Sequence, residues 1–494
     1  MSDSKESKLI SEEQKVLWSD LAEEEDNGGD TKSKDDTPGP SEDQSTQQFE
    51  KLKIADEEGI FKDNLEEVED STIQAVTSGD TLYTSASTFE DLNLSEDLLK
   101  GLYVEMNFSK PSKIQAISLP MILTPPYLDL IAQAHNGSGK TTCFTLGMLC
   151  RVDPRLKRPQ ALCICPTREL SLQNLEVLRK MGKYTGITSE AAIPLDDPKN
   201  DRSRVRPPIM AQIIIGTPGT VKRLMSFKKL SILDMKVLVF DEADHMLSKD
   251  GFQDDSLRIM KEIKGSSVNC QVLLFSATFD EAVKSFVSRT VKQEHNQMFV
   301  KKEELSLKSI KQYKVNCPDE LGKIQVVTNV LDLGEKIGQT IIFVKSKQSA
   351  RMLHLSLQKV GYGVTTIHGA LTNEQRDIIV KEFKDGLTHV LISTDLLARG
   401  FDQKKVNLVV NYDLPVKFEN PSEPNYEVYL HRIGRAGRFG RKGAVFNLLM
   451  EHRDTMIMEK IEKYFGCSVS EVPSWSEETD LREALNSASL MSSE

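Results

Sequence analysis

The sequence predicts an α/β protein with two tandem, doubly wound parallel-sheet domains. Three observations support this fold class: a length of 494 residues, short apolar runs that alternate with helical patterns, and a division of those runs into two series. A chain of this length exceeds one ordinary core, so two or three domains are expected. Apolar runs without polar alternation are typical of parallel strands buried on both faces, and helices between them imply βαβ units.

The strand candidates define the two domains. The first series comprises runs at 128–134, 161–165, 212–216, 236–240 and 271–275. The second series comprises runs at 340–344, 364–368, 389–394 and 408–412. We therefore predict a first domain over 88–300 and a second over 310–475. A linker over 301–309, within a polar connector at 298–310, joins them, and a polar tail follows over 476–494.

The N-terminal segment differs in composition. Residues 1–55 are rich in Ser, Asp, Glu, Lys and Gly, so we expect disorder. Within them, Ile10, Leu17, Trp18 and Leu21 have helical spacing, which fits either a short docking helix or scattered apolar residues in a disordered tail. Residues 56–87 are predicted to hold an amphipathic regulatory helix and its lead-in. One helical face collects the apolar side chains Phe61, Leu65, Val68 and Val76 together with Thr72.

Charge and cysteine content narrow the functional classes. The net charge is −11, but residues 1–80 hold 24 acidic and 8 basic side chains of the 74 and 63 in the chain. The remainder is mildly basic, so phosphate binding is not excluded. The seven cysteines are irregularly spaced, which favours buried thiols in a reducing compartment over a zinc site or disulfides. No apolar run approaches the roughly 18 residues that span a bilayer, so we expect a soluble intracellular protein without membrane contacts.

A phosphate-binding loop is predicted after the first strand. Its residues are Ala134, His135, Asn136, Gly137, Ser138, Gly139, Lys140 and Thr141. The glycines let backbone N–H groups turn toward a phosphate, Lys140 reaches the β- and γ-phosphates, and the Thr141 hydroxyl ligates Mg²⁺. Ala134 replaces the first glycine of the general pattern. ATP and Mg²⁺ are the cofactors that this loop predicts.

Acidic residues follow the strand at 236–240. Asp241 and Glu242 lie at the carboxyl end of that strand, where ligands of such folds bind. Asp241 suits a Mg²⁺ ligand, and Glu242 suits the group that orients and deprotonates an attacking water. In the second domain, the run from His431 to Arg438 contains Arg435 and Arg438 beside two glycines. Guanidinium groups there suit stabilisation of a transferred phosphoryl group.

Together these motifs resemble the DEAD-box family of superfamily 2 helicases over about residues 88–470, and this resemblance implies that both α/β domains are RecA-like. The resemblance implies that Phe108 stacks on adenine and that Gln115 reads its edge, with Lys110 nearby. It assigns coupling of ATP to RNA to Asp244, Ser276, Thr278 and His431. It assigns nucleotide contacts in the second domain to Gly400, Asp402, Arg435 and Arg438. It assigns RNA-backbone contacts to Pro166, Thr167, Arg168, Thr217, Gly219, Lys345, His368, Gly369 and Thr394.

Other segments are similar to the messenger RNA export subfamily at the nuclear pore. The most specific is the insertion between Asp413 and His431. This resemblance implies a nucleoporin partner and an inositol hexakisphosphate-dependent activator. It also implies a location in the cytoplasm and nucleus and at the nuclear-envelope rim of the pore.

The sequence thus predicts a monomeric, ATP-dependent RNA helicase that clamps single-stranded RNA through its backbone. The clamp would unwind short duplexes and remodel RNA–protein complexes. The alternative is an ATP-gated RNA-binding scaffold with little turnover. We further hypothesise that the helix over 56–80 docks between the domains without RNA and lowers basal hydrolysis, the alternative being a solubilising tail.

Overall fold

The computed structural model describes most of the chain from residue 73 onward. The described residues are 73–76, 83–134, 137–194, 207–247, 252–267, 269–279, 281–300, 310–395, 401, 403–436 and 442–491. The predicted disordered segment and most of the predicted N-terminal helix lie outside these residues. Among the described residues, no helix combines the length and apolarity needed to cross a bilayer.

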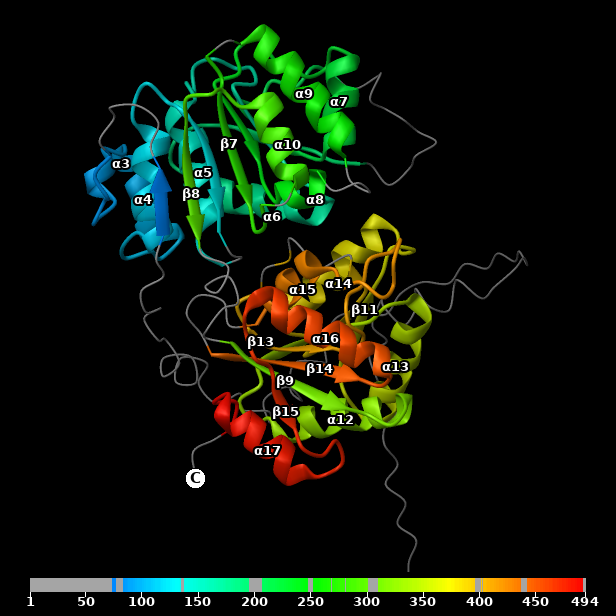
Figure 1. Cartoon of the computed structure of the whole chain (residues 1–494). Helices are drawn as coiled ribbons and strands as arrows, with labels where there is room; N and C mark the ends of the chain where they lie inside the picture. Colours follow the sequence, from blue (N-terminus) through cyan, green and yellow to red (C-terminus); the bar gives the residue numbers. More distant parts are fainter. Residues whose placement is uncertain are drawn as a thin grey trace, which may run out of the picture.

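The first domain is an eight-stranded sheet in the order β1-β8-β2-β7-β6-β3-β5-β4 (Figure 1). Its strands are β1 Ile73–Val76, β2 Asp129–Gln133, β3 Ala161–Ile164, β4 Ser189–Ala192, β5 Ile213–Gly216, β6 Val237–Phe240, β7 Gln271–Ser276 and β8 His295–Val300. Neighbouring strands are parallel, except that β1 runs antiparallel to β8.

Helices cover both faces of this sheet (Figure 1). They are α3 Glu96–Lys100, α4 Lys113–Leu123, α5 Lys140–Arg151, α6 Arg168–Met181, α7 Pro218–Ser226, α8 Ala243–Leu247, α9 Gln253–Ser266 and α10 Glu281–Thr290. Alternate strand residues enter different layers: Val237 and Val239 of β6 pack in one cluster, whereas Leu238 and Phe240 pack in the other. This two-sided burial explains why the strand shows no polar alternation.

The second domain is a seven-stranded, all-parallel sheet in the order β11-β12-β10-β13-β14-β9-β15. Its strands are β9 Ile310–Asn316, β10 Gln339–Phe343, β11 Val364–Ile367, β12 Val390–Ser393, β13 Val406–Asn411, β14 Gly443–Leu449 and β15 Ser470–Val472. Its helices are α12 Glu320–Leu333, α13 Lys347–Lys359, α14 Asn373–Asp385, α15 Tyr426–Ile433, α16 His452–Phe465 and α17 Glu478–Ser487. The predicted fold class and the nine strand runs are confirmed.

Two predicted features at the edges of the first domain are wrong. The amphipathic helix was expected to extend through Val76, but Ile73–Val76 form β1 and pair with Gln297–Val300. Edge pairing with β8 therefore prevails over the helical spacing, as is common for β-branched residues. Residue 298, expected to start the polar connector, belongs to β8 instead, and Met298 is fully buried beside β2.

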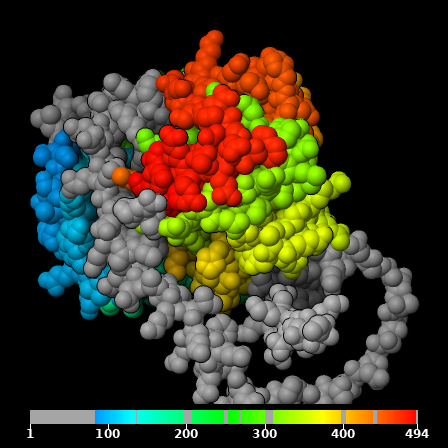
Figure 2. All heavy atoms as spheres, turned by 90° about the horizontal axis from the view of Figure 1, so that it is seen from below, coloured from blue at the N-terminus to red at the C-terminus, as the bar shows by residue number. Residues whose placement is uncertain are grey.

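The predicted polar tail after residue 475 is also wrong. Residues 478–487 form α17, and its buried side chains Leu481, Ala484 and Leu485 join the core shared with α12. Figure 2 shows this C-terminal segment, in red, lying across the green segment that contains α12. Only every third or fourth residue of α17 is apolar, so the composition of this segment predicts a polar tail. The helical spacing of its apolar residues indicates a helix instead.

We predict that α17 stabilises the second domain. Leu485 is fully buried, so Leu485→Ala should lower the free energy of unfolding by about 2–5 kcal/mol. Urea unfolding followed by fluorescence of Trp475, which packs against the same core, measures this change. Arg482→Ala, at an exposed position of α17, is the matched control and should leave the transition unchanged. Equal transitions for both variants would contradict a structural role for α17.

Candidate functional site

The predicted site residues follow the carboxyl ends of neighbouring strands, and the sheet order sorts them into two groups. The phosphate loop, the acidic residues and the Ser276–Thr278 segment follow β2, β6 and β7, where β7 lies between the other two strands. The predicted RNA contacts of the first domain follow β3 and β5, which are also neighbours. Carboxyl ends of parallel strands form one ligand-binding edge. The nucleotide and RNA groups therefore occupy adjacent stretches of a single edge.

The phosphate loop turns sharply before helix α5. Gly137 and Gly139 have φ of 82° and 98°, which a residue with a side chain rarely adopts. Lys140 is buried, and its Nζ donates to the carbonyl of Ala134 at 2.7 Å. The buried Ser138 Oγ has no hydrogen-bond partner in the described part of the chain. A buried hydroxyl in a turn of backbone N–H groups fits a phosphate oxygen.

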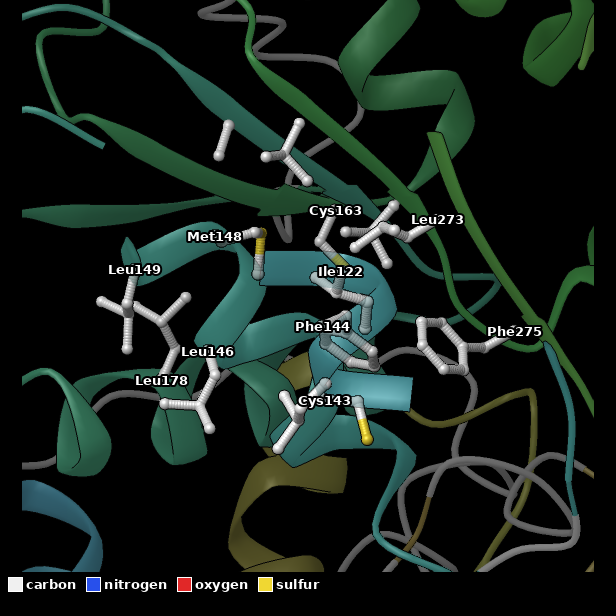
Figure 3. Packing of buried hydrophobic residues seen from close by; sticks show 14 of the residues in the cluster. Ile122, Cys143, Phe144, Leu146, Met148, Leu149, Cys163, Leu178, Leu273 and Phe275 are labelled. Atoms are coloured by element: carbon white, nitrogen blue, oxygen red, sulfur yellow. The ribbon is translucent and has the colours of Figure 1, made fainter. Parts of the chain in front are cut away.

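Helix α5, which directly follows this loop, packs tightly against the sheet. Figure 3 shows Phe144 of α5 packed beside Phe275 of β7, with Ile122 and Leu273 around it. The Phe144 and Phe275 ring centroids lie 5.6 Å apart. The first turn of α5 is thus fixed to the sheet by a close-packed core.

The predicted adenine-reading segment contacts the phosphate loop directly. Ser112 and Gln115 form a capping box at the start of α4. Ser112 Oγ donates to the Ser138 carbonyl at 2.9 Å, and Gln115 Nε2 donates to the Gly139 carbonyl at 3.4 Å. Phe108 stacks on the buried Phe89 ring, with the two ring centroids 6.4 Å apart. Lys110, which lies between Phe108 and Ser112, is exposed, and the segment on both sides of it is anchored.

Asp241 and Glu242 are both almost fully buried at the end of β6. Burial and the neighbouring Glu242 raise the pKa of Asp241 from 3.8 to about 6. Asp241 Oδ1 accepts from the Glu242 N–H at 3.0 Å, and Oδ2 accepts from Asn174 Nδ2 at 2.8 Å. Glu242 has φ of 51°, an uncommon conformation that is found at functional sites. With Thr141, these carboxylates are oxygen donors of the kind that Mg²⁺ takes.

Asp244 has close neighbours in both domains. Its Oδ2 accepts from the N–H and Oγ1 of Thr278, each at 3.0 Å, and its own N–H donates to Ser276 Oγ at 3.2 Å. His431 Nε2 of the second domain lies 3.5 Å from the same Oδ2, and both side chains are fully buried. All four predicted coupling residues are thus brought together.

Within the described part of the arginine segment, Arg435 is buried, with 2% of its surface exposed. Its Nε donates to the His431 carbonyl at 2.9 Å, and its Nη1 donates to the Phe401 carbonyl. Arg432, which the sequence reasoning did not single out, donates to Asp395 and to the Asp413 carbonyl. Five predicted site residues lie outside the described residues: His135, Asn136, Gly400, Asp402 and Arg438.

The predicted RNA contacts of the first domain begin α6 and α7. Thr167 caps α6 by accepting from the Leu170 N–H at 3.2 Å, directly after the buried Pro166. Thr217 precedes α7, and its hydroxyl bonds to Thr220 at 3.3 Å, with Gly219 half-buried between them. The Thr220 side chain therefore stabilises the turn that begins α7.

The predicted RNA contacts of the second domain follow β10, β11 and β12, three neighbouring strands. Lys345 is 60% exposed, and its Nζ lies 3.6 Å from Asp413 Oδ1. His368 is buried, whereas Gly369 is exposed and a Cβ there would meet nothing within 4 Å. Thr394 is half-buried at the end of β12. The exposed lysine and the open glycine give a polymer backbone room to approach.

We call the predicted RNA contacts that follow β3 and β5 the RNA edge of the first domain. Ion pairs connect this edge to α14 of the second domain. Arg168 binds Asp377 through both Nη atoms, at 2.5 and 2.7 Å. Arg376 Nη1 lies 3.7 Å from Glu169 Oε1. Figure 1 shows α6 and α8 of the first domain facing α14 and α15 of the second. The sequence reasoning missed Asp377 because the partner lies 209 positions away in the chain.

Comparison with known proteins agrees with this geometry. The family described as DEAD/DEAH box helicase matches residues 112–286, and the helicase conserved C-terminal domain matches residues 322–440. The chain is 64% identical over 429 residues to DEAD-box ATP-dependent RNA helicase 38 of Arabidopsis thaliana, covering 86% of each chain.

Two solved structures of Saccharomyces cerevisiae Dbp5 are also similar. The complex with RNA and ADP BeF3 matches with a TM-score of 0.75 and 39% identity, covering 82% of this chain and 100% of that one. A Dbp5 variant bound to Nup159, a Gle1 variant, IP6 and ADP matches with a TM-score of 0.57 and 38% identity, covering 80% and 99%.

We predict that ionised Asp241 lowers the free energy of unfolding of the protein when no nucleotide is bound. Its pKa of about 6 exceeds the ordinary 3.8, so ionised Asp241 costs the native state about 3 kcal/mol at pH 8. The native state binds the proton more tightly, so this cost fades as pH falls from 6 toward 4. Asp241→Asn should therefore raise the free energy of unfolding by about 1–3 kcal/mol at pH 8 and by less at pH 5.

Calorimetric unfolding without nucleotide or Mg²⁺ measures this effect. Glu459→Gln, at an exposed position in the middle of α16, is the matched control and should change nothing at either pH. A stability gain of Asp241→Asn that does not depend on pH would contradict the assignment to ionised Asp241.

Proposed function

The chain belongs to the DEAD-box ATP-dependent RNA helicases, and from that premise we propose that it works as an ATP-gated RNA clamp. In this proposal, ATP and RNA bind together to a closed arrangement of the two domains. The clamp separates short duplexes and removes proteins from RNA, and hydrolysis opens it again.

The observation that carries the proposal is the position of Arg168. This predicted RNA contact is held by both of its Nη atoms to Asp377 of the other domain. Its neighbour Glu169 pairs with Arg376, so in this second ion pair the first domain supplies the acidic side chain and the second domain the basic one. The RNA edge of the first domain is therefore part of the contact between the domains. RNA affinity must then depend on closure, which is the requirement for a gated clamp.

The nucleotide side of the site depends on the same contact. Ala277, between Ser276 and Thr278, belongs to one buried hydrophobic cluster with Ile433 of α15. Asp244 and His431 meet in the same region. Closure thus changes the surroundings of the acidic segment as well as those of the RNA edge. Two ligands that favour one closed state bind cooperatively and reciprocally.

Each catalytic side chain has a proposed task. Lys140 neutralises the β- and γ-phosphates, Glu242 orients and deprotonates the attacking water, and Arg435 with Arg438 stabilises charge on the transferred group. Thr141 and Asp241 would hold Mg²⁺, which supplies charge neutralisation at the phosphates when bound. Phe108, Lys110 and Gln115 would recognise the adenine.

We further propose the cellular context. The similar yeast Dbp5 variant was solved with Nup159, a Gle1 variant and IP6. By analogy, this chain would act in messenger RNA export, with a nucleoporin and an inositol hexakisphosphate-dependent activator as partners. It would act as a monomer in the cytoplasm and nucleus, concentrated at the nuclear-pore rim.

Variants at Lys140 and Glu242 should separate binding from hydrolysis. Lys140→Ala should weaken ATP binding itself, because the buried ammonium contributes to the phosphate site. Glu242→Gln should retain ATP binding but slow hydrolysis by about 100-fold or more, because a carboxamide is a poor base. The Glu242→Gln protein should therefore stay on RNA in the presence of ATP.

RNA release and phosphate release, measured with and without RNA, test the proposal. Wild-type hydrolysis should rise with RNA, and a flat response would favour an ATP-gated scaffold with little turnover. If Glu242→Gln dissociates from RNA in ATP as fast as wild type, hydrolysis does not open the clamp and the proposal fails.

A further inference from the structure

Asn174 is a buried amide in helix α6 that has no place in the site as described so far. Its side chain is fully buried. Its Nδ2 donates to Asp241 Oδ2 at 2.8 Å and to Cys165 Sγ at 3.4 Å. Its Oδ1 is buried and has no hydrogen-bond partner within the described residues.

Packing does not explain an amide at this position. The other inward-facing side chains of α6 include Leu170, Leu175 and Leu178, which belong to the hydrophobic core of the first domain. A leucine in place of Asn174 would have the same branched shape without burying an unsatisfied acceptor, which is a costly feature. The gain that offsets this cost is the hydrogen bond to the Asp241 carboxylate, which is stronger than a bond between neutral groups.

The bond fixes the orientation of the Asp241 carboxylate. One oxygen accepts from the Glu242 N–H at 3.0 Å, which belongs to the same strand end. The other oxygen accepts from Asn174, which approaches from α6. Two donors from different elements define the plane of the carboxylate, whereas one donor would leave it free to rotate about its last bond.

We propose that Asn174 is a positioning residue for Mg²⁺, holding Asp241 in the orientation that the metal requires. This inference rests on the proposed function, in which Asp241 serves Mg²⁺ bound with ATP. Groups that hold a metal ligand from behind commonly change metal affinity by 10- to 100-fold when they are removed.

The position of Asn174 also links the metal side to the RNA side of the site. Thr167 caps α6, and Asn174 lies seven residues later, about two turns along the same helical face. The first turn of α6 carries Arg168 and its contact with Asp377. One rigid helix therefore touches the RNA edge at its beginning and the metal ligand two turns later.

The test compares nucleotide affinity with and without Mg²⁺ in the full chain. Asn174→Leu keeps the branched shape and removes the donor, and Asn174→Ser keeps a polar group that is too short to reach Asp241. Binding of a fluorescent ATP analogue is measured in chelator and across a Mg²⁺ series. Both variants should bind the metal-free analogue within about twofold of wild type. Both should need roughly 10-fold more Mg²⁺ for the half-maximal gain in affinity.

Cys165→Ala is the matched control, because it removes the other contact of the amide and leaves the bond to Asp241. It should show the wild-type Mg²⁺ response. Folded Asn174 variants with the wild-type Mg²⁺ response would overturn the positioning role. A wild-type protein whose analogue affinity ignores Mg²⁺ would overturn the proposed function itself, so the two failures are distinguishable.

Discussion

The buried carboxylate of Asp244 lies where the two domains meet and has polar neighbours from both of them. It is fully buried, and it accepts from the N–H and hydroxyl of Thr278 and from the His245 N–H. His431 of the second domain lies 3.5 Å away. A buried charge is tolerated only when polar partners surround it. The first domain supplies three of these contacts by itself, and the second domain completes them only when the two domains meet.

This arrangement explains why each ligand site is built at the border between the domains. The predicted nucleotide residues follow β2, β6 and β7, and the predicted RNA residues follow β3 and β5 of the same sheet. Helix α6 connects the two groups, since it carries Arg168 at its start and Asn174 against Asp241. In the proposed clamp, movement of the second domain against α6 and Asp244 would reach both groups through rigid, close-packed elements. No flexible connection between them is required.

Much of this could be predicted from the sequence. Strand runs such as Val237–Phe240 are buried on both faces, so their composition alone identifies them. The phosphate loop and Asp241–Glu242 are local motifs whose spacing carries the chemistry. The strand β1 and the helix α17 could not be found in this way. The first depends on pairing with β8, more than 200 residues later, and the second has a sparse apolar stripe. Asp377 and Asn174 are ordinary polar residues by sequence. Only the fold brings them to Arg168 and Asp241.

The central claim is that closure couples ATP to RNA, and one measurement tests it most directly. The affinity for single-stranded RNA is measured with and without a non-hydrolysable ATP analogue, at fixed salt. The account predicts weak, salt-sensitive binding without nucleotide and at least about tenfold tighter binding with the analogue, which corresponds to about 1.4 kcal/mol of coupling free energy. Equal RNA affinity in the two conditions would contradict the clamp.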